Sequence, residues 1–326
     1  MGFEFIQRAQ KFFVLALTSL TMLVGCRSTS PLVLAYHPFA GYAPAYLAQS
    51  LELWPTKWIE SRLTTSSSQS AKLLRTGQAD AALLTLDEVL RLVASGVALR
   101  VVLVVDQSLG ADVVLARAPL VELAELRNRR IGYEPGTVSE LLARELLDAA
   151  GLTPSDAYQV PFRLDQQEAA WRRGEVDFLV TFHPVSARLR RQGAVVVFDS
   201  RKTPQLILDV LAVREQALHS KRAALSALIE GWFRGLERVQ RYEEDTRWRL
   251  TPWLGLTPEE VYAGFDGLKL FDVAENRAWL QTEGGARLSQ RAHMLADWMK
   301  QHELLASPAV PELACDDFLP PPRLVR

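Results

Sequence analysis

The stretch GQADAALLTLDEVL, residues 77–90, contains a turn, a strand and the start of a helix. Gly77 and the polar residues after it mark a turn, and residues 79–85 are a short apolar run typical of a strand covered on both faces. The sequence then predicts a helix from Asp87 to Ser95, ended by Gly96. A similar turn and strand recur in GEVDFLVTF, residues 174–182. This alternation indicates an α/β architecture with mainly parallel sheets.

The sequence predicts two sets of such strands, and each set contains one of these two stretches. The first set is predicted at residues 31–37, 57–65, 79–85 and 100–107, and the second at residues 129–134, 158–163, 176–182 and 194–200. One more strand is expected in ILDVLAVRE, followed mainly by helices to about residue 305. Capping-box spacing at Thr137 to Glu140 and at Thr257 to Glu260 predicts two helix starts. The sequence therefore predicts two α/β lobes in which strands and helices follow each other in a similar order.

The composition is that of a globular protein. Of the 326 residues, 48% are hydrophobic and 23% are charged, and the formal net charge is -1. This near-neutral balance provides no basic field for nucleic acid or for an anionic membrane surface. The length is enough for one large or two medium domains, each with a core of its own.

The N-terminus has the pattern of a bacterial lipoprotein. Arg8 and Lys11 precede an apolar run at residues 12–25, which is short for a spanning helix and fits a signal peptide. The run ends in Leu-Val-Gly-Cys26, which resembles a lipobox, so we expect residues 1–25 to be removed and Cys26 to be acylated. Residues 26–31 would then be a lipidated tether. The protein would lie on the periplasmic or cell-surface side of a bacterial membrane.

Two alternatives remain open at this terminus. The apolar run could be an uncleaved anchor with an incidental cysteine. Cys315 is a lone thiol if Cys26 is acylated, whereas a Cys26–Cys315 disulfide would compete with acylation.

Polar and aromatic residues collect where the predicted strands end. In open α/β sheets, ligands bind beyond the carboxyl ends of the strands, close to helix N-termini. The segments at these ends are residues 37–42, 65–70, 85–87, 134–139 and 181–184. They offer aromatic faces, hydroxyls, backbone donors and carboxylates, which is the composition of a small-molecule pocket. The serines could equally be helix caps, Asp87 could favour its helix N-terminus, Phe39 could be core, and Glu134 could pair with an arginine.

Signals for metal binding and catalysis are weak. His37 and His183 each precede a proline at a strand end, but two histidines without a third ligand do not predict a metal site. The chain has no nucleophile elbow, no H-E-x-x-H, no P-loop and no G-x-G-x-x-G. We therefore expect no catalytic residue and no cofactor.

Several segments together resemble a known family. They are GYAPAYLAQ, GQADAALLTLDEVL, VVDQSLGADVVLA, LRNRRIGYEPGTVSELLARELLDAAGL, GEVDFLVTFHPV and FDSRKTPQLILDVLAVRE. In order and spacing, from about residue 32 to 300, they are similar to ABC-transporter solute-binding proteins of the nitrate/sulfonate/taurine type. That family includes thiamine-pyrimidine precursor proteins.

The resemblance implies a two-lobed periplasmic-binding-protein fold of type II with a ligand cleft between the lobes. Lobe one would hold residues 32–110 and 206–326, and lobe two residues 111–205. The expected function is capture of a small organic solute by lobe closure and delivery to a permease in the inner membrane, by a monomer. Position by position, the resemblance and the strand ends together predict these ligand-binding residues: His37, Phe39, Gly41, Tyr42, Ser67, Ser68, Gln69, Thr85, Asp87, Ser108, Glu134, Gly136, Thr137, Ser139 and His183.

The sequence leaves the solute open. Hydroxyls and helix N-termini suit a sulfonate or nitrate, whereas Asp87 and Glu134 suit an amine or a heterocycle with N–H donors. Two other readings of the fold are a sensor for a membrane signalling partner and an enzyme. The enzymes that resemble these binding proteins carry a cysteine-rich motif that this chain lacks.

Overall fold

The structure is a computed structural model that describes residues 30–120, 122–281, 287–306 and 310–321. The predicted signal peptide, and Cys26 with it, lie outside the described residues. Within the described part, no helix has the length and apolar character needed to span a membrane.

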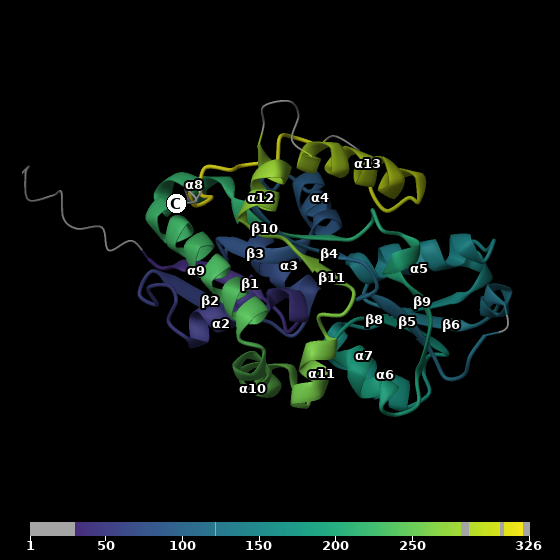
Figure 1. Cartoon of the computed structure of the whole chain (residues 1–326). Helices are drawn as coiled ribbons and strands as arrows, with labels where there is room; N and C mark the ends of the chain where they lie inside the picture. Colours follow the sequence, from purple (N-terminus) through teal and green to yellow (C-terminus); the bar gives the residue numbers. More distant parts are fainter. Residues whose placement is uncertain (1–29, 121, 282–286, 307–309, 322–326) are drawn as a thin grey trace, which may run out of the picture. The chain divides into compact units, whose positions relative to one another are not determined.

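The described strands form two sheets (Figure 1). The strands of the first sheet are β1 Leu32–Tyr36, β2 Ile59–Leu63, β3 Ala81–Thr85, β4 Leu99–Ser108, β10 Leu208–Arg214 and β11 Leu268–Leu270. They lie in the order β11-β4-β10-β3-β1-β2. The strands of the second sheet are β5 Val113–Ala116, β6 Arg130–Tyr133, β7 Tyr158–Pro161, β8 Phe178–Thr181 and β9 Val195–Asp199. They lie in the order β7-β6-β8-β5-β9.

Both sheets are mixed, which corrects the expectation of mainly parallel sheets. β1 pairs in parallel with β2 and β3, and β6 pairs in parallel with β7 and β8. β10 runs antiparallel to β3 and β4, and β5 runs antiparallel to β8 and β9. The reason is the route of the chain, since it leaves the first sheet at the end of β4 and returns beside that end, where Leu208 pairs with Gln107. A strand that re-enters at the same edge must run in the opposite direction.

Helices cover both faces of each sheet. The α-helices are α2 Ala43–Ser50, α3 Ser67–Arg75, α4 Leu86–Ala94, α5 Val138–Ala149, α6 Leu164–Arg172, α7 Val185–Arg190, α8 Glu215–Ser220, α9 Arg222–Arg241, α10 Glu243–Leu254, α11 Pro258–Ala263, α12 Val273–Leu280 and α13 Arg287–Gln301. Short 3-10 helices are η1 Ala40–Tyr42, η2 Leu123–Leu126, η3 Pro154–Asp156 and η4 Ser200–Lys202.

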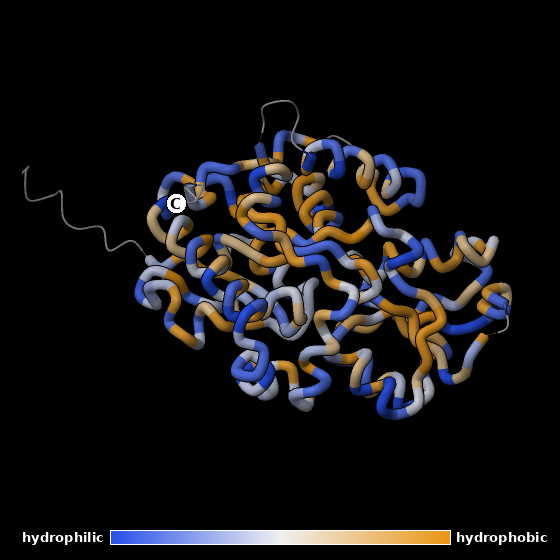
Figure 2. The backbone as a smooth tube through the Cα atoms, viewed as in Figure 1, coloured by the Kyte–Doolittle hydropathy of each residue, from blue (hydrophilic) through white to orange (hydrophobic). Residues whose placement is uncertain are grey.

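Side-chain alternation along the strands divides the core. In β1, Leu34 packs in a cluster with Leu228 of α9, while its neighbour Ala35 packs with Val89 of α4 on the other face. In β5, Val114 packs with Leu142 of α5, and Leu115 belongs to the cluster on the opposite face. The strands are therefore the hydrophobic interior, and the polar sequence lies mainly on the helices and loops, as Figure 2 shows.

Local sequence explains where several helices begin. Glu88 in the first turn of α4 accepts a hydrogen bond from the backbone N–H of Thr85, and Thr257 caps α11 in a capping box with Glu260. Thr137 caps α5 by accepting a hydrogen bond from the backbone N–H of Ser139. α4 begins directly after β3 and α5 shortly after β6, whereas α11 follows α10.

Candidate ligand-binding site

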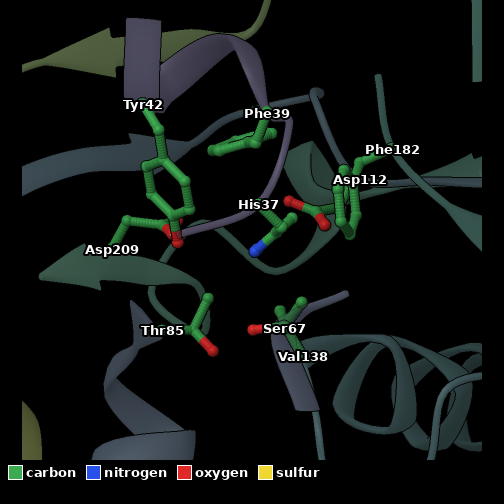
Figure 3. A pocket seen from close by; sticks show the side chains of 9 residues that line it. All are labelled: His37, Phe39, Tyr42, Ser67, Thr85, Asp112, Val138, Phe182 and Asp209. Carbon is green, nitrogen blue, oxygen red and sulfur yellow. The ribbon is translucent and has the colours of Figure 1, made fainter. Parts of the chain in front are cut away.

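A small cavity lies between residues at or near the ends of strands of both sheets. From the first-sheet side it is lined by His37, Phe39, Tyr42, Ser67, Thr85 and Asp209, and from the second-sheet side by Asp112, Val138 and Phe182. Figure 3 shows these side chains converging on one space from several elements. The cavity volume is about 10 Å³, which is about what one water molecule requires. The surrounding groups are therefore close together.

Aromatic rings form one wall of the cavity. The rings of Phe39 and Tyr42 have centroids 5.0 Å apart and meet edge to face. Phe182, from the loop after β8, lies 5.3 Å from Phe39 and 5.7 Å from His37, centroid to centroid. This wall joins the loop after β1 to the second sheet.

Tyr42 connects the aromatic wall to a carboxylate. Its hydroxyl donates a 2.5 Å hydrogen bond to Oδ1 of Asp209, and both side chains are buried. Burial raises the pKa of Tyr42 well above its ordinary value, and the charge of Asp209 adds to this. Tyr42 is therefore a neutral donor to Asp209.

Three polar side chains lie in a row across the first sheet. Asp209 of β10 pairs in register with Thr85 of β3 on one side and with Asp106 of β4 on the other. Like charges directly opposite each other on neighbouring strands are unfavourable. Both Asp106 oxygens are buried and have no hydrogen-bond donor, and burial with the nearby Asp112 raises the pKa of Asp106 well above its ordinary value. Burial, with the charge of Asp106, likewise raises the pKa of Asp209.

Gly41 allows this row to approach the loop after β1. A Cβ atom at Gly41 would lie 2.1 Å from Oδ2 of Asp106 and 2.6 Å from Cε1 of Phe39. Both separations are shorter than real Cβ contacts, so a side chain at this position would require Asp106 and Phe39 or the loop to shift.

Glu88 accepts hydrogen bonds from two residues that line the cavity, Ser67 and Thr85. Its Oε2 accepts a 2.7 Å hydrogen bond from the Ser67 hydroxyl and a 3.0 Å hydrogen bond from the backbone N–H of Thr85. Its Oε1 is buried without a donor, and burial raises its pKa well above the ordinary value. The hydroxyl oxygen of Thr85 is also buried and unpartnered.

Asp112 lies where the chain passes from the first sheet to the second. Its backbone N–H donates to Oγ of Ser108, whose hydroxyl lies 2.7 Å from that of Ser200 at the second crossing. The side chain of Asp112 lines the cavity, and burial raises its pKa to about 6.

The predicted ligand-binding residues fall into two groups in the structure. His37, Phe39, Tyr42, Ser67 and Thr85 line the cavity, and Gly41 adjoins it. The remaining predicted residues do not line it: Ser68, Gln69, Asp87, Ser108, Glu134, Gly136, Thr137, Ser139 and His183. Whether any of these residues touches a ligand stays a prediction.

Several of the second group hold the surrounding loops. Glu134 accepts hydrogen bonds from the backbone N–H groups of Ser68, at 3.4 Å, and Leu164, at 3.2 Å. Gln69 accepts from the backbone N–H of Thr65, and Gly136 donates to Glu140. These residues bridge or cap the segments around the cavity.

Asp87 and the α5 start have partners of their own. Asp87 lies 3.8 Å from Nε of Arg91, which also contacts Glu140 at 3.1 Å. The Thr137 hydroxyl donates to the carbonyl oxygen of Glu134.

His183 packs away from the cavity. Its Nδ1 lies 3.2 Å from the Ser186 hydroxyl, and its Nε2 lies 3.2 Å from the carbonyl oxygen of Glu260 at α11. Burial lowers its pKa. Its neighbour Phe182 contributes to the cavity instead, so the two histidines do not face each other across it.

The predicted ligand-binding residues did not include Asp112, Val138, Phe182 and Asp209, although Val138 and Phe182 lie within the predicted strand-end segments. A signal was present for Asp209, because a charged residue inside the apolar run ILDVLAV requires a reason. Phe182 adjoins the predicted His183, and Val138 follows the predicted cap of α5.

Neither a metal centre nor a disulfide is found in the described part of the chain. No three His, Cys, Asp or Glu side chains there are arranged to hold a metal ion. Cys315, the cysteine of the described residues, is a buried free thiol whose pKa is raised by burial.

Comparison with known proteins identifies the family. Residues 41–244 match the family described as NMT1/THI5 like. The chain belongs to the NMT1/THI5-like family. This confirms the resemblance found in the sequence. No curated protein matches the chain.

Solved structures of low sequence identity share the fold of this NMT1/THI5-like chain. The alkanesulfonate-binding protein SsuA from Xanthomonas axonopodis pv. citri, bound to MOPS, has a TM-score of 0.73 at 16% identity, covering 86% of this chain and 96% of that one. The aliphatic sulphonate binding protein SsuA from Escherichia coli has a TM-score of 0.69 at 18% identity, covering 86% and 95%. The nitrate-binding protein NrtA from Synechocystis PCC 6803 has a TM-score of 0.62 at 13% identity, covering 76% and 74%. The fold is therefore that of periplasmic binding proteins.

Proposed function

We propose that this chain is the solute-binding component of an ABC import system and has no catalytic role. It would capture a small organic solute between two lobes, residues 32–110 with 206–326 and residues 111–205. The closed form would deliver the solute to a membrane permease. Acylated Cys26 would hold the protein on the outer side of a bacterial membrane.

The observation that carries this proposal is the cavity, because its lining comes from elements of both sheets. A ligand bound there contacts both halves at once, and so favours the arrangement in which they lie together. Family membership and the likeness to periplasmic binding proteins support the same role.

Polar contacts beside the cavity also join the two halves. Glu134 accepts from Ser68, Arg91 contacts Glu140, and the Thr65 hydroxyl donates a 2.9 Å hydrogen bond to Asp165. The structure thus has the contacts expected of a closed form. Because the cavity is about 10 Å³, a solute larger than water needs the halves to move apart before it enters.

The proposal is tested with full-length protein purified in detergent. A thermal-shift screen of sulfonates, amino acids, pyrimidines and polyamines should find a compound that raises Tm, since a ligand stabilises the folded state. Small-angle scattering with that compound should show a closed particle, and uptake of the radiolabelled compound by cells should be lost when the chain is deleted.

Three results would contradict parts of this proposal. Chemical turnover of the compound would make the protein an enzyme. Normal uptake in the deletion strain, with a changed transcriptional response, would favour a sensor. Absence of any scattering change on binding would exclude closure.

A further inference from the structure

The cavity is surrounded by carboxyl groups. Asp112 and Asp209 line it, Asp106 adjoins Asp209 across the sheet, and Asp87 and Glu88 follow Thr85 at the start of α4. Each of these side chains is buried, with between 0% and 4% of the residue exposed. Buried carboxylates require a positive or hydrogen-donating partner.

The described protein provides few such partners. No lysine or arginine lines the cavity. Arg91 lies 3.8 Å from Asp87, but it also contacts Glu140 and the Leu304 carbonyl oxygen. Asp209 accepts a hydrogen bond from the Tyr42 hydroxyl, whereas neither oxygen of Asp106 accepts a hydrogen bond. The carboxyl groups at this site therefore have few positive or hydrogen-donating partners in the described protein.

Two neutral side chains independently point to a missing ligand. The Thr85 hydroxyl oxygen and Nδ1 of His37 are buried in the cavity lining and have no hydrogen-bond partner. Thr85 and His37 are 5% and 3% exposed. Figure 3 shows a ring nitrogen of His37 directed into the space between Asp209, Thr85 and Ser67. Polar atoms so deeply buried are normally satisfied, so a group that can bond to them is expected here.

We propose that the site takes a small protonated amine, held between Asp209, Asp112 and the faces of Phe39, Tyr42 and Phe182. An ammonium group donates up to three hydrogen bonds, which suits carboxylates and the Thr85 oxygen. Aromatic faces attract cations through their quadrupole. This inference rests on the proposed solute-binding function and names the ligand class of the same site.

The same carboxyl groups would be unfavourable for an anionic solute. A sulfonate or nitrate in this cavity would lie beside Asp112 and Asp209 without a lysine or arginine in the lining. Like charges held close together in a site of low dielectric repel strongly. An anion is therefore disfavoured even though the named relatives of similar fold include sulfonate- and nitrate-binding proteins.

The test compares cations with anions on the full-length protein. The amine probes are methylamine, ethanolamine and putrescine at neutral pH, and the anion probes are methanesulfonate and nitrate. Binding is followed by thermal shift and isothermal titration calorimetry. At least one amine should raise Tm, and the anions should not.

Variants locate the binding. Asp209→Asn and Asp112→Asn keep the side-chain shape and remove the charge, so each should weaken amine binding roughly 10- to 100-fold. Asp177→Asn is the matched control, because Asp177 pairs with Arg130 at the opposite end of β8 and does not line the cavity. Its affinity should be that of the wild type, and circular dichroism checks the fold of each variant.

The other outcomes each overturn the inference. Stabilisation by an anion and not by an amine would overturn the ligand class while leaving the solute-binding function intact. Equal amine affinity in wild type, Asp209→Asn and Asp112→Asn would place the amine elsewhere. If no probe binds, the inference fails, and the scattering and uptake measurements above judge the proposed function separately.

Discussion

At the scale of single residues, Gly41 has the tightest surroundings of the site. A methyl group there would lie 2.1 Å from the Asp106 carboxylate. We predict that Gly41→Ala destabilises the protein by about 1–3 kcal/mol, because either the loop or Asp106 must shift. Urea unfolding followed by circular dichroism measures this change.

A double variant tests the cause. Asp106→Ala removes the atom that the new methyl group would strike, so Gly41→Ala should cost less in that background. Equal costs in the two backgrounds would show that Asp106 is not the obstacle.

The raised pKa of Asp112 predicts that the stability of the folded protein depends on pH, with a sign that follows from the direction of the shift. Burial raises that pKa from 3.8 to about 6, so its contribution to stability is complete below pH 3.8 and is lost as pH rises through 6. The contribution is about 3 kcal/mol, at about 1.4 kcal/mol for each pKa unit. Asp112→Asn should remove this part of the pH dependence in ligand-free protein.

The comparison must be a difference between variant and wild type. Burial lowers the pKa of His37 from 6.5 to about 3, so its contribution to stability is lost as pH falls through that range, opposite in sign to Asp112. Subtracting the Tm profiles of Asp112→Asn and wild type between pH 4 and 7 cancels His37. A flat difference would contradict the role given to Asp112.

At the scale of elements, the sequence was most informative where the cause is local. The starts of α5 at Thr137 and of α11 at Thr257 were predicted from side chains three residues apart, which a sequence displays directly. Thr257 forms the predicted capping box with Glu260, and Thr137 caps α5 by accepting from Ser139. The direction of β10 depends on where the chain returns from the second sheet, so the local sequence could not supply it. β5 and β11 were not predicted, and β11, of three residues, lies in a segment expected to be mainly helical.

The site divides in the same way. His37, Phe39 and Tyr42 follow a strand that was predictable, and they line the cavity. Asp209 lies within a strand and reaches the cavity through its pairing with Thr85. Such a neighbour across a sheet depends on strand order, which no local pattern contains.

Glu134 gives a prediction about elements, because it joins the starts of two helices. It accepts from Ser68 at the start of α3 and from Leu164 at the start of α6, on opposite halves of the cavity. A negative charge at helix N-termini is favourable. Glu134→Gln should therefore destabilise the protein by about 1–2 kcal/mol and weaken solute affinity several-fold.

The matched control is Glu175→Gln, since Glu175 is paired with Arg173 at an exposed turn. Thermal melting and calorimetry with the solute found in the screen measure both effects. If Glu134→Gln behaves like Glu175→Gln, the carboxylate does not hold the halves together.

At the scale of the whole molecule, membrane attachment and solute binding should be separable. The predicted attachment depends on Cys26, which precedes the folded region that begins with β1 at Leu32. Two or more acyl chains, at about 0.8 kcal/mol per buried methylene, would hold the protein stably on a membrane. The cavity, by contrast, is made entirely by residues 37–209.

We therefore predict that Cys26→Ala abolishes labelling by radioactive palmitate and releases the protein from the membrane fraction. Its solute affinity should equal that of the wild type, because no residue of the cavity changes. Cys315→Ala is the control, since Cys315 is buried beside Val101 of the first sheet and should leave labelling intact. Equal labelling of Cys26→Ala and wild type would refute lipid attachment at Cys26, and loss of labelling only in Cys315→Ala would move the acylated thiol to the other cysteine.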